Sequence, residues 1–171
     1  MVIMEHLLIP HKRAELLSKE MLDKLGERLN CEIELDENTV RIKGESYDEY
    51  NAKNVMQAFG RGFDINKAYR LLNEDCFFQQ VNLKDAFRSR DQLARVKARL
   101  IGKEGRAKEY IESVSGVDMA VYGGTVCTIG SADELKIADA AIQVIIDGGM
   151  HKTAYMIMEK EKLKLREEKH A

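Results

Sequence analysis

Two stretches of the chain share one pattern of apolar and polar positions. Residues 31–43 alternate apolar and polar side chains, which predicts two half-buried strands joined by a turn at 36–38. Residues 117–130 repeat this alternation around a turn at 122–124. The expected inward-facing positions are Ile33, Leu35, Val40 and Ile42 in the first stretch and Met119, Val121, Val126 and Ile129 in the second.

A helix is predicted after each pair of strands, because apolar residues there recur every three or four positions. Ser46 and Ser131 are the expected N-caps, and Gly60 and Gly148 mark the expected ends. The expected buried positions are Tyr50, Val55, Met56 and Phe59 in the first helix and Leu135, Ala138, Ile142, Ile145 and Ile146 in the second.

Further elements precede and follow each strand pair and its helix. Apolar segments at 7–9 and 77–83 predict a first strand in each copy, and a helical pattern then leads to the strand pair. A last helix is expected at 64–73 in the first copy and at 150–169 in the second. The helical positions before the strands are Leu16, Leu17, Met21, Leu25 and Leu29, and then Leu100, Ile101, Tyr110, Ile111 and Val114.

These two copies form an internal repeat. The matched pairs, at a constant shift of 130 − 44 = 86 residues, include Thr39 and Thr125, Val40 and Val126, Gly44 and Gly130, and Gly62 and Gly148. The order of elements predicts an α+β fold of two tandem domains, at 1–74 and 75–171, each a three-stranded antiparallel sheet packed by three helices. The second domain is expected to carry an extra C-terminal helix.

Composition places the chain among ordinary globular proteins, with 44% hydrophobic and 33% charged residues. No apolar run approaches the ~18 residues of a membrane span, and residues 1–6 lack a signal-peptide pattern, so we expect a cytoplasmic protein. Cys31, Cys76 and Cys127 are far apart and form no CxxC pair. We therefore expect no metal, no cofactor and no disulfide framework.

A Gly-x-x-Gly motif, Gly102-Lys103-Glu104-Gly105, separates the two helical patterns that precede the second pair of strands. Glycine lets the main chain pass close to a phosphate group because it has no Cβ. The start of the next helix, near Arg106, adds free N–H groups and the positive end of a helix dipole. Such a loop can bind about four nucleotides of single-stranded backbone, so we predict an RNA-binding site here.

Basic residues concentrate around this loop, although the formal net charge of the chain is −2. Residues 95–108 hold six cations and one anion, a local balance of +5. The candidate RNA-binding cations are Arg95, Lys97, Arg99, Lys103, Arg106 and Lys108, and the candidate apolar contacts to bases are Ile101 and Val121. Tyr110 and Tyr122 are the nearby aromatic residues, too few for recognition by a row of stacking rings.

The first copy lacks the glycine motif. When Leu17 is aligned with Ile101, the segment Ser18-Lys19-Glu20-Met21 takes the place of the motif. Four cations and three anions between 12 and 24 leave a local balance of only +1. We therefore expect a degenerate copy that serves for packing or protein binding. Its candidate additional RNA contacts are Arg61 and Lys67.

No set of residues typical of an enzyme is visible in the sequence. The four histidines are scattered, and we expect them on the surface. The carboxylates do not converge as a two-metal nuclease would require. Gly102-Lys103 lacks the GxxxxGK[ST] pattern of a phosphate-binding P-loop. We therefore expect a binding protein and not an enzyme.

At these residues the sequence resembles the KH family, and the order strand, strand, helix after the glycine motif resembles the type I arrangement. A closer resemblance, to the archaeal partner-of-Nob-one proteins, covers nearly the whole chain. The segments that carry it are Gly60 to Phe63, Lys67-Ala68, Leu71-Leu72, Ile101 to Lys108, Val121 to Gly123, Ile129-Gly130 and Gly149 to Tyr155.

This resemblance implies an RNA-binding protein of small ribosomal subunit assembly. It implies binding near the 3′ end of the small-subunit rRNA, work with the Nob-type endonuclease that trims this RNA, and a link to the alpha subunit of translation initiation factor two. The residues leave open a second class of function, a protein-interaction scaffold in translation or RNA decay with little RNA binding of its own. The degenerate first copy favours a scaffold, whereas the basic glycine motif of the second favours RNA binding.

Overall fold

The computed structural model describes residues 4–171, which divide into two compact units, one ending at Glu74 and the other spanning Asp75–Ala171. The first unit contains β1 (Glu5–Leu8), α1 (His11–Ala14), α2 (Lys19–Leu29), β2 (Cys31–Asp36), β3 (Thr39–Gly44), α3 (Ser46–Gly60), α4 (Ile65–Ala68) and the short 3-10 helix η1 (Tyr69–Leu72). The second unit contains β4 (Phe77–Asn82), η2 (Leu83–Asp85), α5 (Arg90–Ile101), η3 (Lys103–Gly105), α6 (Arg106–Ser115), β5 (Asp118–Tyr122), β6 (Thr125–Gly130), α7 (Ala132–Ile146) and α8 (His151–His170).

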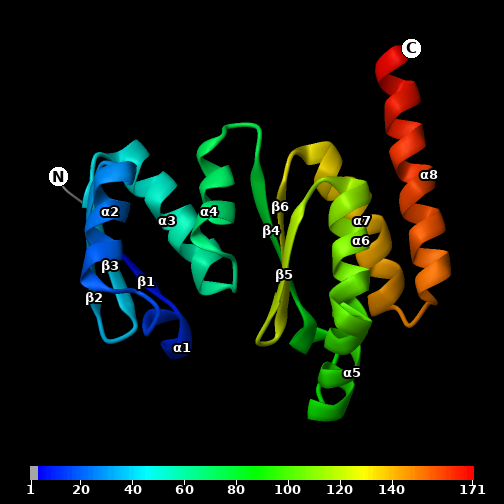
Figure 1. The fold of residues 1–171 in the computed structure, drawn as a ribbon, viewed down its shortest axis with the longest axis horizontal. Coiled ribbons are helices and arrows are strands. Elements are labelled where there is room, and N and C mark those ends of the chain that lie inside the picture. The colour runs from blue at the N-terminus through cyan, green and yellow to red at the C-terminus, as the bar shows by residue number, and fades with distance from the viewer. Residues whose placement is uncertain (1–3) are drawn as a thin grey trace. The chain divides into compact units, whose positions relative to one another are not determined.

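Each unit has its own three-stranded antiparallel sheet (Figure 1). The order is β1-β3-β2 in the first sheet and β4-β6-β5 in the second. The strand pairs predicted from the alternation are therefore hairpins, and the earlier strand of each unit pairs with the second strand of its hairpin. The predicted α+β class and the two three-stranded antiparallel sheets are confirmed.

The hydrophobic core of the second unit lies between its sheet and its helices. Helices α6 and α7 cover one face of the sheet, and α8 packs on the far side of these two helices (Figure 1). The most deeply buried large side chains are Leu83, Leu100, Ile111, Met119, Ile129, Ile145 and Met158. Each contributes about 1.5–3 kcal/mol by leaving water. This core fixes α5, α6 and β5, the elements that carry the predicted site.

Some local predictions are wrong. Ser46 is the first residue of α3 and not its N-cap, which is Glu45. No side chain caps this helix, and Glu49 Oε1 accepts a hydrogen bond from the Gly44 amide, just before the helix, at 2.9 Å. Tyr50 is 63% exposed, because the buried position in this turn of α3 belongs to its neighbour Glu49. The two helices expected before β2 are present as α1 and α2, but Leu16, expected on a helix, lies in the turn between them and is exposed. Ser131, in contrast, caps α7 as predicted, and it forms a capping box with Glu134, the third residue of that helix.

The structure tests the expected absence of a membrane span, but it only partly covers the segment considered for a signal peptide. Residues 1–3, the start of the segment considered for a signal peptide, lie outside the described residues. None of the helices between residues 4 and 171 combines the length and apolar character that a membrane crossing requires.

Candidate nucleic-acid interface

The glycine motif forms a tight reversal between α5 and α6. Gly102, Glu104 and Gly105 have φ values of 76°, 56° and 77°, in a region that residues with a Cβ seldom adopt. A Cβ added at Gly102 would lie 2.6 Å from the Cβ of Ala107, so packing inside the loop requires this glycine. A Cβ added at Gly105 would meet no atom within 4 Å. The main chain at Gly105 is therefore open to an approaching ligand.

Helix α6 begins directly after this loop without a side-chain cap. The Arg106 amide donates to the carbonyl oxygen of Lys103, but no side chain caps the amides that follow, and this end of the helix is positively polarised. Arg106 Nη2 lies 3.1 Å from Glu104 Oε2, but both side chains are mostly exposed, so this pair is weak. Within the part of the chain that the structure describes, the exposed Lys103 side chain has no ionic partner. Amides and cation together favour an anionic group such as a phosphate.

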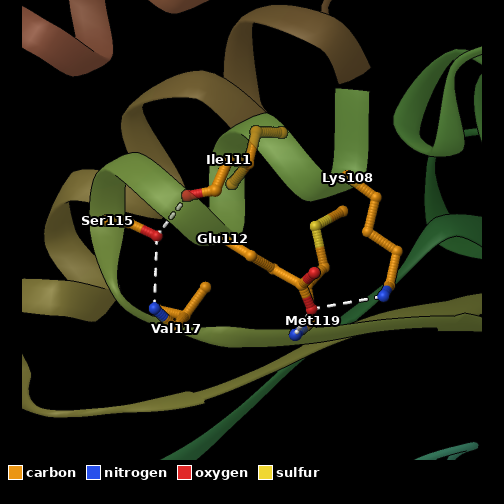
Figure 2. A network of polar contacts seen from close by, with 6 residues as sticks. All are labelled: Lys108, Ile111, Glu112, Ser115, Val117 and Met119. Atoms are coloured by element: carbon orange, nitrogen blue, oxygen red, sulfur yellow. Dashed lines mark hydrogen bonds and ion pairs between the residues drawn. The ribbon is translucent and has the colours of Figure 1, made fainter. Parts of the chain in front are cut away.

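One carboxylate connects α6 to the edge of the sheet. Figure 2 shows Glu112 Oε1 accepting a hydrogen bond from the Met119 amide at 2.9 Å, with Lys108 Nζ 3.2 Å away. At the end of α6, Ser115 Oγ accepts a hydrogen bond from the Val117 amide at 3.3 Å. These contacts hold α6 against β5 and place the half-buried Lys108 side chain between the helix and the strand.

Strand β5 lies at the edge of its sheet. In an antiparallel ladder, alternate residues direct their main-chain N–H and C=O groups away from the partner strand. Because the Met119 amide points to Glu112, the main-chain groups of Val121 point to the same open edge. The Val121 side chain packs against the core, and Ile101 is half-buried at the end of α5. Unpaired strand groups beside a glycine loop offer hydrogen bonds to the edges of unstacked bases.

The cations of α5 point in different directions. An α-helix turns by about 100° per residue, so Lys97 shares a face with Ile101, whereas Arg95 lies roughly 120° away from it. Lys97 is half-buried, and Arg95 is exposed. The structure therefore places Lys97, but not Arg95, on the side of α5 that leads to the loop.

Arg99 has a structural role that the sequence analysis missed. Its guanidinium donates hydrogen bonds to the carbonyl oxygens of Ile145, at 2.9 Å, and Gly149, where α7 ends. His151 Nε2 lies 2.7 Å from the Arg99 carbonyl oxygen, so this histidine is half-buried and not on the surface as expected. A guanidinium that satisfies two carbonyls stabilises the helix end. This use argues against the phosphate contact expected of Arg99.

The first unit contains the same contact. Arg13 donates from Nε to the carbonyl oxygen of Phe59, at 2.9 Å, and from Nη2 to that of Phe63, at 2.7 Å. Each of these residues precedes its counterpart in the second unit by 86 positions, as 99 − 13 = 86 shows for the arginines. The repeat was therefore the signal that could have revealed this arginine in both units.

The same shift corrects the alignment of the two loops. Asn30 and Gly116, both left-handed residues, end α2 and α6, and 116 − 30 = 86. Without a gap, residues 16–19 take the place of the glycine motif, two residues earlier than expected from the sequence. Ser18 Oγ accepts a hydrogen bond from the Met21 amide at 3.2 Å and caps α2. No residue of 16–19 has a positive φ.

The other candidate residues occupy less informative positions. Arg61 follows α3 and Lys67 lies in α4, and both already contact other residues of the described chain. Among residues 4–171, no group of His, Cys, Asp or Glu is arranged to hold a metal ion.

Tyr110 is engaged with α8. Its hydroxyl donates a hydrogen bond to Glu159, and this bond raises the pKa of the Tyr110 phenol. Its ring centroid lies 4.4 Å from that of Tyr155. These contacts fasten α8 to α6, so Tyr110 serves packing and not base stacking.

Comparison with known proteins identifies the family. A model described as eukaryotic type KH-domain, KH-domain type I, for the second KH domain of PNO1 proteins, matches residues 77–163. A KH domain-containing protein of Methanocaldococcus jannaschii is 32% identical, over 95% of this chain and 75% of its own length. The chain belongs to the PNO1 family of KH-domain proteins. The resemblance expected from the sequence is thus confirmed.

Other members of the PNO1 family extend this comparison. The pre-rRNA-processing protein PNO1 of Chaetomium thermophilum is 26% identical, and the match covers 75% of this chain and 52% of that protein. This chain therefore spans about half the length of that eukaryotic relative. The crystal structure of Dim2p from Pyrococcus horikoshii matches with a TM-score of 0.83 and 32% identity, over 92% of this chain and 99% of that one.

A second structure from Pyrococcus horikoshii, a complex of a/eIF2alpha, aDim2p and rRNA, contains a chain that matches with a TM-score of 0.86 and 31% identity. The match covers 95% of this chain and 96% of that one.

Proposed function

We propose that this protein binds single-stranded RNA through the glycine motif of its second unit and acts in small ribosomal subunit assembly. One observation carries the proposal: the open main chain at Gly105 leads directly into an uncapped helix, beside the exposed Lys103. Glycine loops of this kind bind the backbone of about four nucleotides. Arg106 and Lys108 add charge to the loop, and Val121 offers main-chain groups to bases. The protein acts as a binding factor in the cytoplasm and not as an enzyme.

The two units are, in this proposal, tandem KH domains at 1–74 and 75–171. The order of strands and helices in the first unit supports this assignment, as does the shared arginine contact. The first domain is degenerate, because residues 16–19 form a serine-capped helix start in place of the glycine loop. Any RNA contacts of the first domain then come from elsewhere, with Arg61 and Lys67 as candidates. Helix α8 is an extension of the second domain.

The RNA we propose is the 3′ end region of the small-subunit rRNA. Support comes from the relatives, one of which is named for pre-rRNA processing and another of which was solved with rRNA and a/eIF2alpha. The proposed protein partners are the alpha subunit of translation initiation factor two and a Nob-type endonuclease, which would act on the RNA that this protein presents.

The test measures binding of a 12-nucleotide fragment from the 3′ end of small-subunit rRNA. We expect affinity for the single strand, weak binding to the same sequence as a duplex, and a slope of log affinity against log salt of roughly −2 to −3 for about four phosphates. Equal binding to the duplex, or no binding to the single strand, would overturn the proposal. Cleavage of the RNA in magnesium or manganese would instead indicate an enzyme.

A further inference from the structure

A basic pocket lies on the second unit, at the opposite end of α5 from the glycine motif. It has a volume of about 570 Å³ and lies between the start of α5 and the turn that joins β5 to β6. Lys84, Arg88 and Arg90 contribute three cations to its wall, and no Asp or Glu among the described residues lines it. The pocket shares no residue with the glycine loop, so its three cations form a separate concentration of positive charge.

The cations of this pocket are not used elsewhere in the described structure. None of the three side chains forms an ion pair or a hydrogen bond with another described residue. Two acids are adjacent to these cations in sequence, Asp85 after Lys84 and Asp91 after Arg90, but neither lines the pocket. Asp85 accepts a hydrogen bond from Asn82 Nδ2 at 3.1 Å. The charge of the pocket is therefore available to an external anion.

The stem of Lys84 lies along the turn that forms one wall of the pocket. A Cβ added at Gly124 would lie 2.6 Å from Lys84 Cε, so the lysine stem crosses this glycine closely. The Leu83 amide donates a hydrogen bond to the Gly124 carbonyl oxygen at 2.8 Å, which ties the lysine segment to the turn. Beside these residues, the half-buried Phe87 packs against the core and lines the pocket. The pocket thus combines three cations with an aromatic ring.

One face of α5 connects the pocket to the glycine motif. Arg90, Lys97 and Ile101 are seven and four residues apart, which places them on the same side of the helix. Twelve residues give α5 a length of about 18 Å. A strand bound at the loop therefore reaches the pocket only if it extends past the roughly four nucleotides that a loop of this kind binds.

We propose that this pocket binds a further nucleotide of the same single-stranded RNA, with its phosphate at the cations and its base on Phe87. The inference rests on the proposed function, because it assigns a second contact to the RNA held by the loop. The aromatic ring among the cations favours a nucleotide over an acidic peptide, since every base has a face that stacks on a ring.

The test compares a 5-nucleotide and a 12-nucleotide RNA taken from the same sequence. The variant Arg88→Gln/Arg90→Gln should bind the longer RNA about tenfold or more weakly, with a salt slope smaller by roughly 0.7 for one lost phosphate contact. Phe87→Leu, which keeps an apolar side chain in the core, should weaken the longer RNA about tenfold by loss of one stacked base. Both variants should bind the 5-nucleotide RNA as the parent does. Lys164→Gln/Arg166→Gln, on exposed positions of α8, is the charge-matched control and should leave both affinities unchanged.

Each other outcome has a definite meaning. An unchanged affinity of the Arg88/Arg90 variant for the longer RNA overturns the pocket, including the case in which an acidic peptide is its ligand. An equal loss for both RNA lengths, or in the α8 control, overturns a separate nucleotide site. If the parent protein binds neither RNA, the proposed function itself is rejected, so the two failures are distinguishable.

Discussion

The same position in the two units holds two different kinds of helix start. In the second unit, residues 102–105 form an open glycine loop, and α6 begins without a side-chain cap. In the first unit, residues 16–19 run with ordinary φ values, and the Ser18 hydroxyl occupies an amide of α2. A helix that caps itself no longer offers that amide to a phosphate. The comparison shows that a unit of this fold can keep its hydrophobic core although its helix start no longer offers a site for an anion.

The charges around the two loops differ in the same sense. Residues 97–108 hold five Lys or Arg and one Glu, whereas the matching residues 11–22 hold three Lys or Arg and two Glu. At a shift of 86, Lys108 and Glu112 correspond to Leu22 and Gly26. The second unit thus has an ion pair within α6, beside β5, where the first has an apolar residue and a glycine. Backbone shape and charge therefore change together between the units.

The largest expected effect comes from reversing charge at the glycine loop. Lys103→Asp/Glu104→Asp should weaken binding of single-stranded RNA roughly 100-fold, because like charges at a phosphate site cost several kcal/mol. Both side chains are exposed, so the unfolding free energy should stay within about 0.5 kcal/mol of the parent. The measurement is RNA affinity by filter binding, alongside thermal unfolding.

The first unit offers a matched control for this change. Lys19-Glu20, at the start of α2, is the same dipeptide in the same exposed setting. Lys19→Asp/Glu20→Asp should lower RNA affinity by no more than about threefold through the general change in charge. If this control weakens binding as much as the change at 103 and 104, the contrast between the two loops is wrong. Parent-like affinity in a folded Lys103/Glu104 variant would reject the site itself.

The next effect concerns what the two units share. Arg99→Ala should lower the unfolding free energy of the second unit by about 2–4 kcal/mol, because two carbonyls lose a charged donor. Arg13→Ala should lower that of the first unit by a similar amount. Amide hydrogen exchange measures each unit separately. With both units folded, neither change should alter RNA affinity by more than about twofold, since neither guanidinium is placed at a phosphate.

This pair of variants also decides the role first expected of Arg99. An Arg99→Ala protein with parent-like stability and lower RNA affinity would restore a direct contact to RNA. Arg99→Lys is a useful intermediate, because a lysine ammonium cannot reproduce the forked geometry of a guanidinium. We expect it to recover less than half of the lost stability.

The sequence predicted the frame of the protein better than its details. Alternating positions located both hairpins, and the glycine motif located the reversal between α5 and α6, because backbone periodicity and positive φ leave direct marks on composition. The sequence did not separate Arg95 and Arg99 from Lys97, since all three are basic and differ only in the direction of their side chains. It also misplaced the cap of α3, because Glu49 reaches back across the turn to Gly44. Side-chain directions and contacts that form only in the folded chain decide such details.

The smallest expected effect tests the ion pair that the first unit lacks. In Glu112→Gln the amide oxygen can still accept from Met119, while Lys108 loses its counter-charge and becomes available to RNA. We expect a rise in RNA affinity of about two- to threefold and a salt slope steeper by up to roughly 0.7, the value of one further phosphate contact. Glu109→Gln, on the exposed side of α6, is the matched control and should change neither quantity by as much. An equal rise in the control would reduce the effect to net charge. A fall in affinity for Glu112→Gln would mean that the ion pair holds Lys108 in its binding position, which would make the difference from Leu22 and Gly26 one of geometry as well as charge.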